Sequence, residues 1–235
     1  MRPDETPAAP KRFYERAEAV REGGAYVVQL GGRTARSPGR RALSGPRALA
    51  EAMAAEWAAQ GERLDMNRMP LTRLHGRFLD ADDEAQALWT DIPVRFAGTD
   101  LLCYRSDEPG LAKREAEVWQ PYLDRACERL DARFAVTEGI VAVEQDEAVL
   151  RAVRDFVDRL PLARRYALML LTEITGSAVL AMSVLAGDDA DAAFDASRLD
   201  ERHQAERWGE DAEAKDREAR LRADFADVVR YCGLA

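Results

Sequence analysis

The sequence has few of the residues that most often carry chemistry. It contains 3 cysteines and 2 histidines among 235 residues. The cysteines, Cys103, Cys127 and Cys232, are odd in number and far apart, so they form neither a disulfide framework nor a CxxC metal pair. Free thiols of this kind favour a reducing compartment.

Long apolar runs are also missing. The longest uncharged apolar stretch, from Ile174 to Gly187, is shorter than the roughly 20 residues that a helix needs to span a bilayer. The N-terminal segment MRPDETPAAPKR carries acids and has no apolar centre, unlike a signal or transit peptide. We therefore expect a cytoplasmic protein that does not insert into a membrane.

Positive charge is too scarce for a protein that binds nucleic acid. The formal net charge is −9, whereas a phosphate backbone must be met by a basic surface. The charge is also unevenly spread, with a net of +4 over residues 1–75 and −13 over the remainder. This asymmetry indicates two units with different surfaces.

Motifs typical of enzymes are absent from the sequence. There is no GxSxG elbow, GxxxxGK[ST] phosphate loop or GxGxxG fingerprint. His203 and Glu206 share one face of a predicted helix, but no motif supplies a third ligand, so we interpret them as an exposed pair rather than a metal site. We assign no catalytic, cofactor-binding or metal-binding residue, and we expect no cofactor.

The first part of the chain has the pattern of short strands. After a tail at residues 1–10, the run AYVVQL at residues 25–30 is apolar and β-branched. Gly31 and Gly32 follow it and suit a tight hairpin turn, because glycine accepts a positive φ. A helix is expected after Ser44-Gly45-Pro46, with Leu49, Met53 and Trp57 on one apolar face.

The rest of the chain has helical periodicity. Residues 65–79 are expected to be irregular, because Pro70 lies in their middle, and to join the two domains. Single helices are predicted over residues 162–185 and from Asp188 to Trp208, the second ending at a left-handed Gly209, and a last helix over residues 210–232. We predict an α+β protein with a small β-rich N-terminal domain at residues 1–78 and a C-terminal orthogonal α-helical bundle at residues 79–235. Strands are expected before residue 45, or as isolated pairings within residues 65–79 and 99–105.

One segment combines acids, a tryptophan and a helix break. Glu206-Arg207-Trp208-Gly209 is followed by Glu210, Asp211 and Glu213. Such a corner can place its tryptophan in the core beneath it. It can equally present an acidic surface with an aromatic anchor to a basic partner, because tryptophan is enriched at binding hot spots. The residues alone leave both possibilities open.

Several segments in order resemble one known family. They are Lys11-Arg12-Phe13-Tyr14, Ala55-Glu56-Trp57-Ala58-Ala59-Gln60, Met69-Pro70-Leu71-Thr72-Arg73-Leu74, Thr99-Asp100-Leu101-Leu102-Cys103-Tyr104-Arg105, residues 171–180, and Ser197-Arg198-Leu199-Asp200-Glu201 with Trp208-Gly209. Over nearly the whole chain after the tail, the sequence is similar to the assembly chaperones for the α subunit of the catalytic head of F-type ATP synthase. These occur in mitochondria, where the matrix would be their location, and in some α-proteobacteria.

The resemblance implies a function and a partner. It implies a chaperone that binds the unassembled α subunit, prevents its aggregation and yields it to the β subunit, without catalysis. It also suggests a partner-binding region formed by Arg198, Asp200, Glu206, Trp208, Glu210, Asp211 and Glu213. An enzyme of unrecognised type and a stable structural subunit of a complex are the alternatives.

Overall fold

The computed structural model describes residues 10–139, 141–209 and 211–235. The predicted N-terminal tail lies outside these residues, apart from Pro10. The chain forms two compact units, one of Met1–Ala81 together with Gly233–Ala235, and one of Asp82–Cys232. An antiparallel sheet near the N-terminus is followed by a mostly helical region, which confirms the predicted α+β class.

The sheet of the first unit is built around one central strand. Strand β2 (Ala25–Leu30) pairs antiparallel with β1 (Ala17–Glu22), β3 (Arg33–Thr34) and β4 (Ser44–Gly45). The strand predicted over residues 25–30 is thus confirmed. Gly31 and Gly32 have φ values of 57° and 79° and form the turn from β2 to β3, as predicted.

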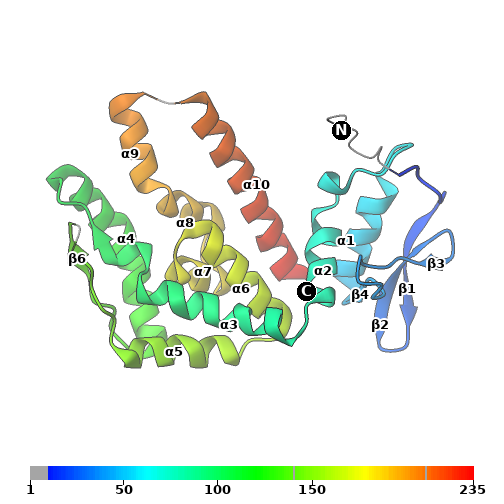
Figure 1. Ribbon diagram of the computed structural model, residues 1–235, viewed down its shortest axis with the longest axis horizontal. Helices are drawn as coiled ribbons and strands as arrows, with labels where there is room; N and C mark the ends of the chain where they lie inside the picture. Colours follow the sequence, from blue (N-terminus) through cyan, green and yellow to red (C-terminus); the bar gives the residue numbers. More distant parts are fainter. Residues whose placement is uncertain (1–9, 140, 210) are drawn as a thin grey trace, which may run out of the picture. The chain divides into compact units, whose positions relative to one another are not determined.

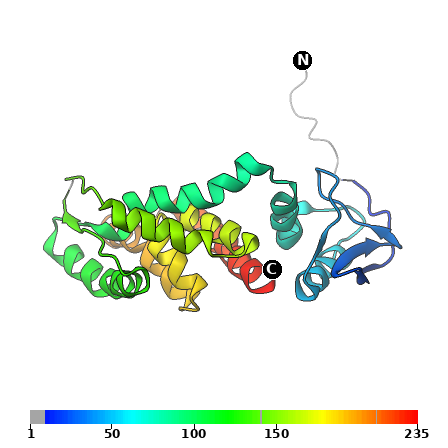
Figure 2. The ribbon, with the colours of Figure 1, turned by 90° about the horizontal axis from the view of Figure 1, so that it is seen from below.

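Helix α1 (Arg47–Ala58) packs on β1 and β2 and buries the predicted apolar face (Figure 2). The expectation of irregular structure at residues 65–79 is wrong, because the short helix η1 (Met66–Arg68) is followed there by helix α2 (Pro70–Asp80). Pro70 begins α2, where its missing N–H has no partner to lose. The buried Glu56 side chain accepts hydrogen bonds from the backbone N–H groups of Leu71 and Thr72, at 2.8 and 2.9 Å, and so caps this helix.

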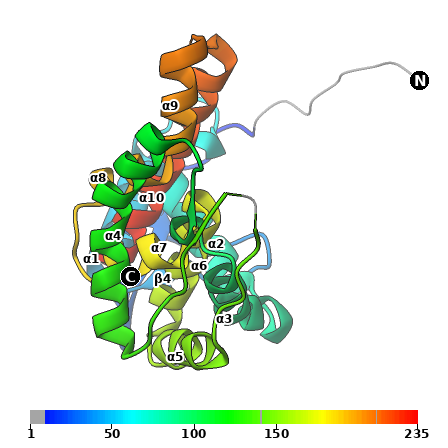
Figure 3. The same ribbon diagram turned by 90° about the vertical axis from the view of Figure 1, so that its left-hand side faces the viewer.

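The second unit is nearly all helical. Helix α3 (Asp83–Gly98) packs against α5 (Glu147–Asp158) and α6 (Leu162–Thr175) (Figure 3). The short helix η2 (Leu101–Cys103) precedes α4 (Pro109–Leu130), which continues through Pro121. Two short strands, β5 (Tyr104–Arg105) and β6 (Thr137–Glu138), pair in parallel. Strand β6 lies outside every segment in which strands were expected, since two residues carry no periodic signal.

The apolar stretch at the centre of this unit forms two helices rather than the predicted one. Helix α6 ends at Gly176, with φ 71°, and α7 (Ala178–Leu185) begins after Ser177. The Ser177 hydroxyl accepts the backbone N–H of Leu180 at 3.0 Å and caps α7. Leu168, Leu171 and Leu180 are fully buried, as an all-apolar helix requires.

The region before Trp208 is also divided. Helix α8 (Ala190–Ser197) and helix α9 (Leu199–Trp208) are separated at Arg198, whose φ of −108° and ψ of 15° leave the helical range. Gly209 has φ 92° and ψ 152°, so the predicted left-handed helical conformation is wrong although the φ is positive. The last helix, α10, spans Ala212–Leu234. Within the described parts of the chain, we find no helix with the length and apolar character that crossing a membrane demands.

Candidate functional site

Apart from Glu210, the predicted partner-binding residues lie between Arg198, just before α9, and the first turn of α10, which follows α9 in the chain (Figure 1). We call the described residues 206–209 and 211–213 the acidic corner. Glu210, which was also predicted to bind the partner, lies outside the described residues. The corner joins the C-terminal end of α9 to the first turn of α10.

Trp208 is the most exposed large apolar side chain among the described residues. Its relative exposure is 80%, so it does not fill the core beneath the corner. Asp211 accepts the backbone N–H of Glu213 at 3.1 Å and holds the start of α10. Glu213 has a side chain exposed by 78% and lies 3.6 Å from Arg217. An exposed tryptophan beside exposed carboxylates favours the binding interpretation of this segment.

The other carboxylate of the corner is paired. Both oxygens of Glu206 accept hydrogen bonds from the Arg114 guanidinium on α4, at 2.9 and 3.2 Å. These hydrogen bonds hold the pKa of Glu206 below its usual value. Arg207 lies 3.5 Å from Glu108, at the start of α4. The outer end of α9 is therefore tied to α4 by exposed ion pairs.

Two predicted residues face the protein rather than the solvent. Arg198 donates to the Ile174 carbonyl at 3.3 Å and to Glu201 at 3.1 Å. The Asp200 carboxyl group lies beside the Glu115 side chain on α4, and its Oδ1 is buried without a hydrogen-bond partner among the described residues. The structure thus separates these two residues, at the base of α9, from the exposed ones at its tip.

The acid that contacts Asp200 was missed in the sequence. Glu115 is 1% exposed, and one of its oxygens accepts the Ser106 backbone N–H at 2.7 Å. Burial, followed by the charge of Asp200, raises the pKa of Glu115 to about 7. Burial also raises the pKa of Asp200. The sequence did contain a signal for its burial, because Glu115 is an acid at helical spacing from the apolar residues Leu111, Val118 and Tyr122.

His203 and Glu206 do not form a metal pair. The Nε2 atom of His203 lies 2.9 Å from Glu108, whereas Glu206 is bonded to Arg114. We find no group of three or more His, Cys, Asp or Glu residues that could hold a metal ion in the described ranges.

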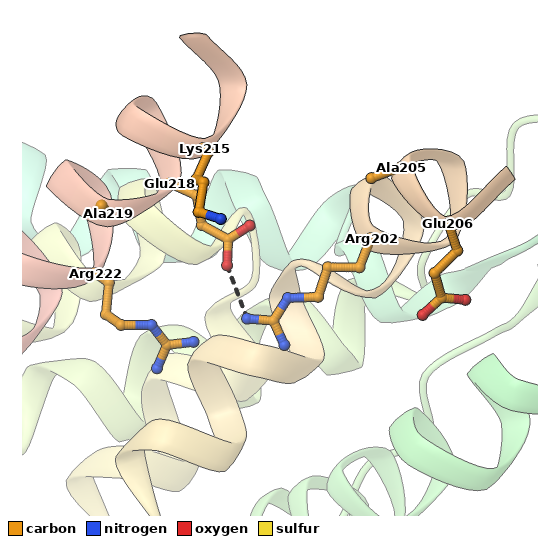
Figure 4. A pocket seen from close by; sticks show the side chains of 7 residues that line it. All are labelled: Arg202, Ala205, Glu206, Lys215, Glu218, Ala219 and Arg222. Carbon is orange, nitrogen blue, oxygen red and sulfur yellow. Dashed lines mark hydrogen bonds and ion pairs between the residues drawn. The ribbon is translucent and has the colours of Figure 1, made fainter. Parts of the chain in front are cut away.

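A groove lies between α9 and α10. It has a volume of about 550 Å³ and is lined by Arg202, Ala205, Glu206, Lys215, Glu218, Ala219 and Arg222. Figure 4 shows Arg202 reaching across it from α9 to Glu218 on α10, at 2.8 Å. Arg222 is paired with Asp191 and Asp195 on α8. The first pair joins α9 to α10, and the other two join α10 to α8. The residues that line the groove do not form the convergent set of groups that an active site requires.

Comparisons with known proteins show one family to which the chain is similar. The family model described as ATP12 chaperone protein matches residues 11–127. The mitochondrial protein atp12 of Schizosaccharomyces pombe is 24% identical over 226 residues, which cover 88% of this chain and 77% of that protein. The crystal structure of Atp12 from Paracoccus denitrificans is similar with a TM-score of 0.90 and 37% identity, covering 95% of this chain and 97% of that one. A crystallised protein of Agrobacterium tumefaciens gives a TM-score of 0.89 and 33% identity, covering 96% and 86%.

Proposed function

Because the chain belongs to the ATP12 chaperone family of ATP synthase assembly factors, we propose that it binds the unassembled α subunit of ATP synthase. In this proposal it prevents aggregation of the α subunit and releases it to the β subunit as the catalytic head forms. The chain is a chaperone and not an enzyme, as its family indicates. We place the activity in the cytoplasm, where its three free cysteines stay reduced.

The observation that carries the proposal is the exposure of Trp208 within the acidic corner. A tryptophan that is 80% exposed is available to a partner, and tryptophan is enriched among the residues that anchor binding surfaces. The exposed residues Asp211 and Glu213 follow this anchor closely in the chain, and their carboxylates would meet a basic patch on the client. Similarity to Atp12 over 95% of the chain supports the choice of an ATP synthase subunit as the client.

The direct test is co-expression with the isolated α subunit of an α-proteobacterial ATP synthase. We expect the α subunit to become soluble and to elute with the chaperone as a stoichiometric complex. Adding the β subunit should then displace the chaperone. Failure to keep the α subunit soluble would contradict the proposal, and stable recovery of this chain with assembled ATP synthase would favour a structural subunit instead.

A Trp208→Ala variant tests the surface. The side chain is exposed, so its removal should change the free energy of unfolding by less than about 0.5 kcal/mol. Capture of the α subunit should fall by at least tenfold if Trp208 is the anchor, since hot-spot residues contribute about 2 kcal/mol or more. The matched control is Leu88→Ala, which removes an apolar side chain of 48% exposure from the remote helix α3.

A further inference from the structure

Helix α9 is attached to the rest of the bundle almost without apolar contacts. Among its described residues only Leu199 is buried. Its remaining attachments to α4 are polar, and those of Glu206, Arg207 and His203 lie at partly exposed positions. Exposed ion pairs contribute little to stability. The contact between Asp200 and the buried Glu115 is therefore the buried polar attachment of α9 to α4.

This contact joins two carboxyl groups, and ionising both of them carries a large free-energy penalty. Glu115 is 1% exposed, and Oδ1 of Asp200 is buried. Two carboxylates in contact repel, and one of them retains its proton when they are buried. Glu115 is the more deeply buried of the two, since Asp200 is half-buried, so Glu115 keeps the proton and donates it to Asp200.

A buried cation faces the pair. Arg105 is 6% exposed, and its guanidinium donates to the Glu115 carbonyl at 3.1 Å and to the Gln120 side chain at 3.3 Å. With one proton on Glu115, the group of Arg105, Glu115 and Asp200 is neutral; without it, the group carries a net charge of −1. The other charged or titratable groups near the pair are Cys103 on η2, Glu108 at the start of α4, and Glu201 and His203 on α9 itself. Glu201 is paired with Arg198, and His203 with Glu108.

We propose that Glu115 is a positioning residue for the acidic corner, because the proton that it shares with Asp200 fixes the first turn of α9 on α4. Asp200 then acts within the protein and does not touch the client, in contrast to the role expected from its sequence. Loss of the proton leaves two carboxylates facing Arg105 and loosens α9. Trp208 lies at the other end of the same ten-residue helix, so it loses its fixed position. The effect on client binding rests on the proposed function, whereas the attachment of α9 does not.

The direction of the pH dependence follows from linkage. A glutamate exposed to water has an ordinary pKa of 4.5, and the pKa of Glu115 is about 7 when α9 is attached. The attached state therefore binds the proton more tightly, and attachment is strongest below pH 4.5. The equilibrium constant for attachment falls by up to about tenfold per pH unit as the pH rises towards 7. Above that pH it no longer changes.

The test compares Glu115→Gln with the wild type. The amide donates the same hydrogen bond without titrating, so hydrogen exchange of α9 amides in the variant should lack the extra pH dependence that the wild type shows from about pH 5 to about pH 7. Infrared difference spectra at about pH 6 should show one protonated carboxyl group fewer in the variant. Glu117→Gln, on an exposed position of the same helix, is the matched control and should behave as the wild type.

Capture of the α subunit provides the functional measurement. Between about pH 6 and about pH 8, capture by the wild type should fall by a factor at least about threefold larger than capture by Glu115→Gln. Capture by Glu115→Ala should be weak at every pH. The inference is overturned if Glu115→Gln keeps the wild-type infrared band and the wild-type pH profile of exchange. If the wild type captures no α subunit, the proposed function fails, while the exchange and infrared results still decide the role of Glu115.

Discussion

The Ser177 hydroxyl donates a 2.7 Å hydrogen bond to Oδ1 of Asp100, 77 positions earlier in the chain. Asp100 also accepts the backbone N–H groups of Leu102 and Val179, at 3.1 Å each. One fully buried carboxyl group thus begins η2 and holds the start of α7. It joins η2 to the break between α6 and α7, within a stretch for which the sequence predicted one continuous helix.

Replacing Asp100 with asparagine should reveal an unusual pH dependence. Burial raises the pKa of Asp100 to about 6 from the ordinary aspartate value of 3.8. The folded state therefore holds the proton more tightly than the unfolded state, and the contribution of Asp100 to stability falls as the pH rises from about 4 to about 6. Urea unfolding should show the wild type gaining roughly 2–3 kcal/mol over Asp100→Asn between about pH 7 and about pH 4. A difference that stays constant with pH would mean that Asp100 titrates normally.

Leu171→Ala should destabilise the helical unit. Leu171 on α6 is fully buried, so its truncation removes transfer free energy and leaves a cavity. We expect a loss of about 2–5 kcal/mol in the free energy of unfolding. Leu162→Ala is the control on the same helix, because Leu162 is 47% exposed and its truncation should change stability by less than about 0.5 kcal/mol. Equal effects from the two variants would contradict the packing of α6.

Trp57→Arg should damage the chaperone itself rather than its surface. Trp57 is 8% exposed, and its ring lies edge to face with that of Tyr14 at 5.9 Å. Arginine would remove this packing and bury an unpaired charge, so most of the protein should be unfolded or aggregated. Trp57→Phe is the control. The Trp57 Nε1 atom has no hydrogen-bond partner among the described residues, so phenylalanine should cost only about 1–2 kcal/mol. A folded Trp57→Arg variant that fails to bind the client would show that this residue belongs to the binding surface.

Long periodic patterns in the sequence were sufficient to predict the fold class and several elements. The apolar, β-branched run at residues 25–30 and the face of Leu49, Met53 and Trp57 predicted a strand and a helix that the structure confirms. The missed features depend on single residues. Asp100 lies far from the stretch Leu162–Leu185 in the sequence, and no pattern connects the two. Its hydrogen bond with Ser177, next to Gly176, nevertheless helps to divide that stretch into two helices.

The candidate site was predictable only in part. Acids, tryptophan and glycine in one short segment identified the corner, and the exposure of Trp208 agrees with a binding surface. The inward direction of Asp200 depends on Glu115, which lies on another helix. Pairings of this kind cannot be read from spacing, because no local periodicity relates α4 to α9.

Charge reversal at the tip of the acidic corner should slow binding without affecting the fold. Glu213→Lys changes a carboxylate that is 78% exposed and lies in an i,i+4 pair with Arg217. Carboxylates at the rim of an interface steer a basic partner and fix its orientation, so we expect the association rate with the α subunit to fall several-fold at low salt. Raising the salt should weaken the wild type more than the variant, because screening removes the attraction that the variant already lacks. Stopped-flow tryptophan fluorescence, to which the exposed Trp208 contributes, would follow the association.

Glu147→Lys is the matched control for this reversal. Glu147 is 86% exposed and lies in an i,i+4 pair with Arg151, but on the remote helix α5. Both substitutions change the net charge by the same amount and break the same kind of surface pair. A general charge effect would therefore lower the association rate of both variants equally. A specific role of the corner requires that Glu213→Lys be slow and Glu147→Lys resemble the wild type. If both variants associate at the wild-type rate in low salt, the corner does not steer the client, and the α subunit must dock on another surface.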